Sequence, residues 1–137
     1  MERSPSSKQL QKLQQLLKIV SDVTGVPERD ILGKRRNEKF VIARILLFAA
    51  ARKCMTITYY QLVPFFNLTE HSTLCYYSRI HARNVKDGQE QKMRLNHVAM
   101  YLAYWKHICD LINQSASLKR GLKSVKNLEY TYRRTKL

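Results

Sequence analysis

The chain has 137 residues, a length that suits one domain, and 45% of them are hydrophobic, which is enough to bury a core. Lys and Arg number 25 against 10 Asp and Glu, for a formal net charge of +15, so an anionic partner is expected, nucleic acid first and an acidic membrane surface second. The longest apolar run, residues 45–51, is too short to span a bilayer, and three widely spaced cysteines provide neither a disulfide framework nor a zinc site.

Two helices are predicted before residue 34. Ser4-Pro5-Ser6-Ser7 is typical of a helix start, and the leucines after it recur at three- and four-residue intervals. This pattern predicts an amphipathic helix that ends near Gly25. Pro27 is expected to open a short second helix, and Gly33 to close it.

A basic loop and a central helix follow. The loop, KRRNEK, contains Lys34, Arg35 and Arg36, and the next helix, residues 38–54, is apolar on most sides. Arg44 and Arg52 lie eight residues apart on this helix, which places them on roughly the same flank. Eight Lys or Arg against two acids between residues 29 and 53 favour a phosphate-facing surface over a merely solvated loop.

Residues 58–86 fit two helices joined by a tight turn. Thr58 is expected to cap the first helix, which Pro64 should shorten or distort, and Thr69 to cap a second helix that runs from Glu70 to about Lys86. Such a pair matches a helix-turn-helix unit, whose second helix enters the DNA major groove with its N-terminus first. Residues 69–73 would then lie at base edges. The alternative, that Ser72 and Thr73 are only cap residues, stays open.

The last part of the chain is predicted to hold a helix and a tail. Asp87-Gly88 is expected to break the chain before a long helix over residues 91–114, whose wide apolar arc fits core packing or a homodimer contact. The folded domain is thus predicted to span residues 1–114. Residues 115–137 carry seven Lys or Arg and one acid, and are expected to form a basic, flexible tail.

Two stretches carry a resemblance to a known family. IVSDVTGVPERDILGKRRNEKFVIAR and ITYYQLVPFFNLTEHSTLCYYSRI, with the helix between them, resemble the C-terminal DNA-binding domain of the bacterial replication initiator DnaA. The resemblance runs without a gap from about Val20 to Arg79. That family has Asp-His-Thr-Thr at its recognition helix, where this chain has Glu70-His71-Ser72-Thr73. The resemblance implies an all-α helix-turn-helix domain of the DnaA C-terminal or Trp repressor-like type, here with an added C-terminal helix.

The resemblance also implies which residues touch DNA. Arg36 would reach into the minor groove, and the other base contacts would come from Thr69, Glu70, His71 and Ser72. The phosphate contacts would come from Lys34, Arg35, Arg44, Arg52, Tyr59, Tyr60, Thr73, Tyr76 and Arg79. Tyr59 and Tyr60 stand where the family has Leu-Pro, and Asn67-Leu68-Thr69 stand where it has Gly-Gly-Arg. The arginine that could read guanine is therefore missing, so the preferred DNA sequence is expected to differ from that of the family.

These observations predict sequence-specific binding of double-stranded DNA, in replication initiation or its control, by a cytoplasmic, nucleoid-associated protein. No GxxxxGK[ST] phosphate loop occurs, so no ATPase is expected. No catalytic constellation is visible either, so we expect no enzyme activity, cofactor, metal or small-molecule substrate. The competing interpretations are a charge-driven protein that binds RNA or any nucleic acid, and a transcriptional regulator.

Overall fold

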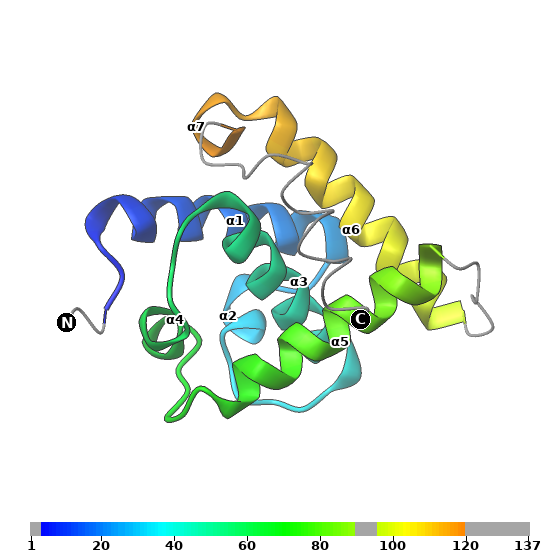
Figure 1. Ribbon diagram of the computed structural model, residues 1–137, viewed down its shortest axis with the longest axis horizontal. Coiled ribbons are helices and arrows are strands. Elements are labelled where there is room, and N and C mark those ends of the chain that lie inside the picture. The colour runs from blue at the N-terminus through cyan, green and yellow to red at the C-terminus, as the bar shows by residue number, and fades with distance from the viewer. Residues whose placement is uncertain (1–3, 90–95, 120–137) are drawn as a thin grey trace.

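The computed structural model describes residues 4–89 and 96–119, and this part of the chain is helical without a strand (Figure 1). The helices are α1 (Ser7–Thr24), α2 (Glu28–Ile31), α3 (Glu38–Cys54), α4 (Tyr59–Phe65), α5 (Ser72–Gln89), α6 (Asn96–Gln114) and α7 (Ala116–Lys119). This order confirms the predicted all-α class, a helix-turn-helix followed by a C-terminal helix.

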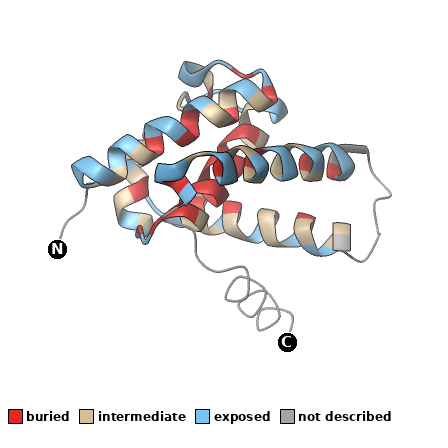
Figure 2. Cartoon of the chain, turned by 90° about the horizontal axis from the view of Figure 1, so that it is seen from above, coloured by how far each residue is buried: buried red, intermediate tan, exposed pale blue. Residues whose placement is uncertain are grey.

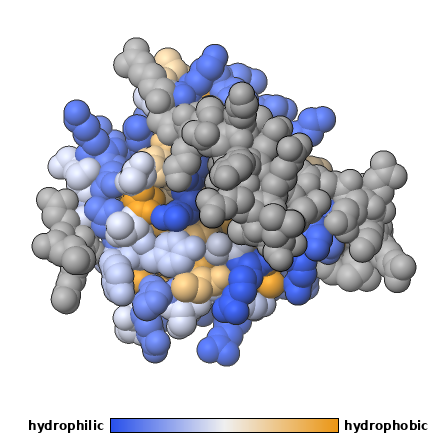
Figure 3. All heavy atoms as spheres, in the orientation of Figure 1, coloured by the Kyte–Doolittle hydropathy of each residue, from blue (hydrophilic) through white to orange (hydrophobic). Residues whose placement is uncertain are grey.

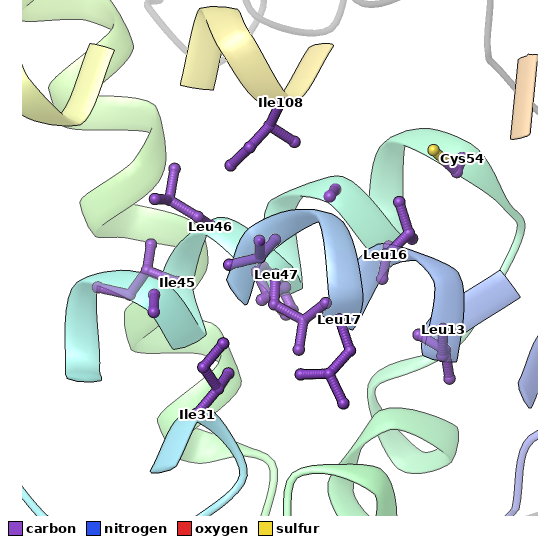
Figure 4. Packing of buried hydrophobic residues seen from close by; sticks show 14 of the residues in the cluster. Leu13, Leu16, Leu17, Ile31, Ile45, Leu46, Leu47, Cys54 and Ile108 are labelled. Carbon is purple, nitrogen blue, oxygen red and sulfur yellow. The ribbon is translucent and has the colours of Figure 1, made fainter. Parts of the chain in front are cut away.

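Helix α3 forms the centre of the fold. Every residue from Ala43 to Ala51 is buried, and α3 packs against α1, α5 and α6. In Figure 4, Leu46 of α3, Leu16 of α1 and Ile108 of α6 belong to one apolar cluster, and each is fully buried. Figure 2 shows the buried residues gathered where the helices face one another, while the outer faces are exposed. The apolar sequence of α3 thus specifies the helix around which the others assemble.

Two capping boxes fix how α1 and α4 begin. At α1, the Ser6 N–H donates to Gln9 Oε1 (2.8 Å) and the Gln9 N–H donates to Ser6 Oγ (3.2 Å). At α4, Thr58 and Gln61 exchange the same pair of bonds (2.9 and 3.1 Å). The boxes are joined, because Gln61 Nε2 donates to Gln9 Oε1 (3.3 Å) and Gln9 Nε2 donates to the Thr56 carbonyl (3.0 Å). The first turn of α4 is therefore held against the first turn of α1.

A polar pair joins α5 to α6, in which Tyr101 is buried and His81 half-buried. His81 Nδ1 shares a hydrogen bond with the Tyr101 hydroxyl, and the His81 ring meets the Trp105 ring edge-on with 4.6 Å between centroids. Burial, and to a smaller extent the charge of Lys53, lowers the pKa of His81 from 6.5 to about 4. His81 is thus a hydrogen-bonded histidine of the interior that stays neutral at pH 7.

The structure corrects the predicted break at Asp87-Gly88. Both residues lie inside α5, which continues to Gln89. A side chain at Gly88 would bring its Cβ within 2.1 Å of Leu102 Cδ1 on α6. The glycine therefore lies where two helices pack closely and does not mark a turn, and a larger residue there would displace the Leu102 side chain.

The first residues of the predicted tail belong to the described part of the chain. Residues 116–119 form α7, and Leu118 is 1% exposed within the core cluster. The rest of the predicted tail, residues 120–137, and the predicted start of the last helix at Gln91 lie outside the described residues. A homodimer contact through α6 stays a prediction. Its residues Tyr101, Ile108 and Ile112 are buried within the chain. No helix in the described ranges has the length and hydropathy needed to cross a membrane.

The neutral state of His81 predicts an acid-sensitive fold. The pKa is about 4 in the folded protein against 6.5 as the ordinary value. Between pH 6.5 and about pH 4, His81 is therefore protonated in the unfolded chain and neutral in the folded protein. The free energy of unfolding falls as the pH decreases through this range. Between pH 7 and pH 5 the free energy of unfolding should fall by about 1–2 kcal/mol, measured by urea denaturation.

The matched variants are His81→Gln and His107→Gln, since His107 is an exposed histidine of α6. The fall should disappear in His81→Gln and persist in His107→Gln. An equal fall in both variants would show that other groups cause the acid sensitivity.

Candidate functional site

The turn between α4 and α5 is closed by a left-handed asparagine. Asn67 has φ 56°, and the next residue, Leu68, donates its N–H to the Val63 carbonyl at 3.0 Å. This bond satisfies a carbonyl at the end of α4 in the manner of a Schellman motif. Apart from glycine, asparagine is among the residues that adopt this conformation most readily, so Asn67 suits a position at which glycine is common.

Asn67 also connects the turn to the basic loop. Its side-chain Nδ2 donates to the Leu32 carbonyl at 2.9 Å, across 35 positions of sequence. Leu32 is the C-terminal cap of α2, directly before Gly33 and the basic residues. Figure 1 places the loop after α2 and the turn before α5 together along the lower edge of the molecule.

The second helix of the pair starts two residues later than predicted. Thr69 and Glu70 lie in a bend, and α5 begins at Ser72. The His71 carbonyl accepts the Cys75 N–H at 3.1 Å, so His71 and not Thr69 occupies the cap position. The N–H groups of Ser72 and Thr73 precede the first intrahelical bond and can meet an acceptor from outside the helix, whereas Leu74 is fully buried.

The four predicted base-contacting residues of this segment are all exposed at one end of α5. They are Thr69, Glu70, His71 and Ser72. Among the predicted phosphate contacts on α5, Tyr76 and Arg79 are exposed, and Thr73 is half-buried. The structure therefore brings these seven residues together on the helix and the turn before it.

Aromatic side chains border this end of α5. The rings of Tyr60 and His71 lie 5.3 Å apart between centroids, and Tyr60 is 58% exposed. Tyr76 is 52% exposed one turn further along α5. Tyr59, in contrast, turns inward, and its ring meets Phe48 edge-on at 5.5 Å. Of the two tyrosines at the start of α4, Tyr60 is thus the one that faces solvent.

The basic loop is exposed along its whole length. Lys34, Arg35 and Arg36 are all exposed, and Asn37 then caps α3 by accepting the Lys39 N–H at 3.1 Å. Hydrophilic side chains project from the lower edge of the space-filling view in Figure 3, the edge along which Figure 1 places this loop. The basic loop therefore runs along the same edge of the molecule as the turn before α5 (Figure 1).

Arg44, one of the predicted phosphate contacts, makes its hydrogen bonds inside the protein. Its side chain is 7% exposed, Nε donates to the Ile31 carbonyl at 2.8 Å, and Nη2 donates to the Asp30 carbonyl at 3.0 Å. Burial raises the pKa of Tyr77 on α5, and the neighbouring Arg44 guanidinium opposes part of that rise. The guanidinium is thus used to join α3 to the end of α2 and to α5.

Arg52 is divided between the interior and the surface. Its Nη1 donates to the Ile57 carbonyl, and its guanidinium carbon lies 4.9 Å from the centroid of the Tyr59 ring. The side chain is half-buried beside the start of α4. These contacts support the loop between α3 and α4, and the phosphate contact of Arg52 stays a prediction.

Sequence reasoning missed the connecting role of Asn67. The sequence predicted a turn at Asn67-Leu68, but the hydrogen-bond partner of the side chain lies 35 residues away. An asparagine at a helix C-terminus does indicate a left-handed residue. Only the folded chain shows that its amide reaches Leu32.

Comparison with known proteins agrees with this arrangement. Residues 13–80 match the family model described as the bacterial DnaA protein helix-turn-helix. The match covers α1 from Leu13 onward, α2 to α4 and the first half of α5, and so includes the basic loop and the turn at Asn67. No curated protein and no solved structure matches the chain.

The internal role of Arg44 predicts a loss of stability when it is replaced. Arg44→Ala removes the donors to two carbonyls and empties a buried position, so the free energy of unfolding should fall by about 2–4 kcal/mol. Urea denaturation measures this fall. Arg79→Ala, at an exposed position of α5, should change stability by no more than about 0.5 kcal/mol. Equal midpoints for Arg44→Ala and the unaltered protein would contradict the internal role.

Proposed function

Because residues 13–80 form a helix-turn-helix domain of the bacterial DnaA family, a family of DNA-binding domains, we propose that the chain binds double-stranded DNA at defined sequences. The proposed role is in replication initiation or its control. These 137 residues contain no phosphate-binding loop of the GxxxxGK[ST] type. We therefore propose that they contribute DNA recognition and no ATP hydrolysis or other enzyme activity of their own.

The observation that carries the proposal is the position of the basic loop beside the start of α5. The two segments meet through the bond from Asn67 Nδ2 to the Leu32 carbonyl. In a helix-turn-helix complex the second helix enters the major groove with its N-terminal residues at the base edges. With α5 in that position, Arg36 is proposed to reach the adjacent minor groove. One face of the protein then contacts both grooves.

The side chains at the start of α5 suit base recognition. The carboxylate of Glu70 can accept a hydrogen bond from cytosine N4, and the hydroxyl of Ser72 can donate or accept. The imidazole of His71 is held beside the Tyr60 ring and can lie against a thymine methyl. Arg36 suits A·T-rich flanks, where a narrow minor groove deepens the negative potential.

Phosphate contacts are proposed to supply most of the affinity. The formal net charge is +15, and exposed cations occur in the basic loop and at Arg79. Each neutralised phosphate releases counterions, which makes binding dependent on salt. A DNA-bound protein in the bacterial cytoplasm, associated with the nucleoid, is the corresponding proposal for its location.

Base reading and charge can be separated with three variants. His71→Ala should cost about 1–3 kcal/mol on a site selected from random duplexes, and have little effect on a scrambled duplex. Arg36→Ala should weaken sites with A·T flanks most. Arg79→Ala should weaken both duplexes similarly. Equilibrium titrations with fluorescent duplexes measure all three.

Equal losses on both duplexes for every variant would favour the alternative, a charge-driven binder without sequence preference. Equal binding of the unaltered protein to all duplexes and RNAs would point the same way.

The salt dependence gives a separate prediction. If about five to eight phosphates are neutralised, log K should fall with log salt at a slope of about −4 to −7. Arg79→Ala should make this slope less steep by about one. Titrations at salt concentrations from about 50 to 200 mM measure this slope. A slope near zero for the unaltered protein would exclude nucleic acid as the partner.

A further inference from the structure

The bond between the Asn67 side chain and the Leu32 carbonyl lies at the base of both proposed reading segments. Arg36 follows Leu32 by four residues, and His71 follows Asn67 by four residues. We propose that Asn67 is a positioning residue that sets the distance between the basic loop and the start of α5, and with it the number of base pairs between the two sequences read. This inference rests on the proposed function.

The geometry makes such a connection effective. Arg36 and His71 each lie four residues beyond one partner of this hydrogen bond, and four residues span at most about 14 Å. Both side chains are therefore positioned relative to the same fixed point. Base pairs along DNA are about 3.4 Å apart, so a shift of either segment by that distance changes the reading by one base pair. Holding the two segments together at 2.9 Å between Nδ2 and the carbonyl oxygen therefore suits the selection of one spacing over its neighbours.

Apolar packing and one hydrogen bond hold the two segments in place. Leu32 and Leu68 are half-buried and pack against the core cluster, which holds each segment to the body of the protein. Among the hydrogen bonds of the described residues, the bond from Asn67 is the one that joins the residues after α2 to the turn before α5. Asn67 is also the one non-glycine residue of the described ranges with a positive φ.

A purely local role for Asn67 makes a different prediction. If the residue only closes the turn, a glycine would serve equally well, because glycine adopts a φ of 56° without strain. Asn67→Gly keeps the backbone conformation and removes the amide. Asn67→Asp keeps the size and the tolerance for positive φ, but replaces the donor with an oxygen that cannot donate to Leu32. The two variants separate the turn from the connection.

The experiment uses the full chain and three duplexes that contain the selected site. The first duplex is the original. The second has one base pair inserted between the core sequence that α5 is proposed to read and its A·T flank, and the third has one base pair removed at the same place. The measured quantity is the ratio of Kd on a shifted duplex to Kd on the original. This ratio cancels the added negative charge of Asn67→Asp, which weakens binding to all three duplexes alike.

The unaltered protein should bind the shifted duplexes at least about tenfold more weakly, comparable with one or two mismatched base pairs. In Asn67→Gly and Asn67→Asp the ratio should fall below about threefold. Affinity of Asn67→Gly for a scrambled duplex should change less than about twofold, because the phosphate contacts remain.

Two outcomes overturn this inference alone. The first is a spacing ratio retained in Asn67→Gly or in Asn67→Asp. The second is an unaltered protein that prefers the core sequence but tolerates either shift. An unaltered protein without any sequence preference overturns the proposed function as well, so the two failures are distinguishable.

Discussion

The buried guanidinium of Arg44 is the constraint on which the site depends, because it joins three helices at one point. It extends from α3, donates to the last carbonyls of α2 at Asp30 and Ile31, and lies beside Tyr77 of α5. The C-terminal end of a helix is a favourable place for a cation, and carbonyl acceptors compensate for the water that burial removes. The basic loop starts at this junction, so its direction is determined by a contact made inside the protein.

The helices themselves could be predicted because local patterns determine them. The spacing of leucines in α1, the apolar run of α3 and the cap at Thr58 each depend on neighbours within a few residues. Arg44 could not be assigned in the same way. A charged residue on a helix flank has the same pattern whether phosphate or a backbone carbonyl meets it, and only tertiary contacts distinguish the two. Gly88 is a similar case. Whether a glycine ends a helix or allows close helix packing depends here on Leu102 of another helix.

The candidate site could likewise be predicted in part. The exposed residues from Thr69 to Ser72 follow from the position of the turn, and small errors in the helix start do not remove them from the surface. The connection through Asn67 depends on a distance between segments that are far apart in sequence. The burial of Leu118 was not predicted because a single leucine among cations gives a weak apolar signal in the sequence.

The joined capping boxes give α1 a part in the behaviour of the helix-turn-helix. Gln9 completes the box at Ser6 and also accepts a hydrogen bond from Gln61, which completes the box at Thr58. Fraying of the first turn of α1 therefore removes a partner from the start of α4. Local opening at the two helix starts is therefore coupled although 52 positions separate the glutamines. Amide hydrogen exchange near Gln61 then reports on the integrity of the first turn of α1, far from any residue proposed to touch DNA.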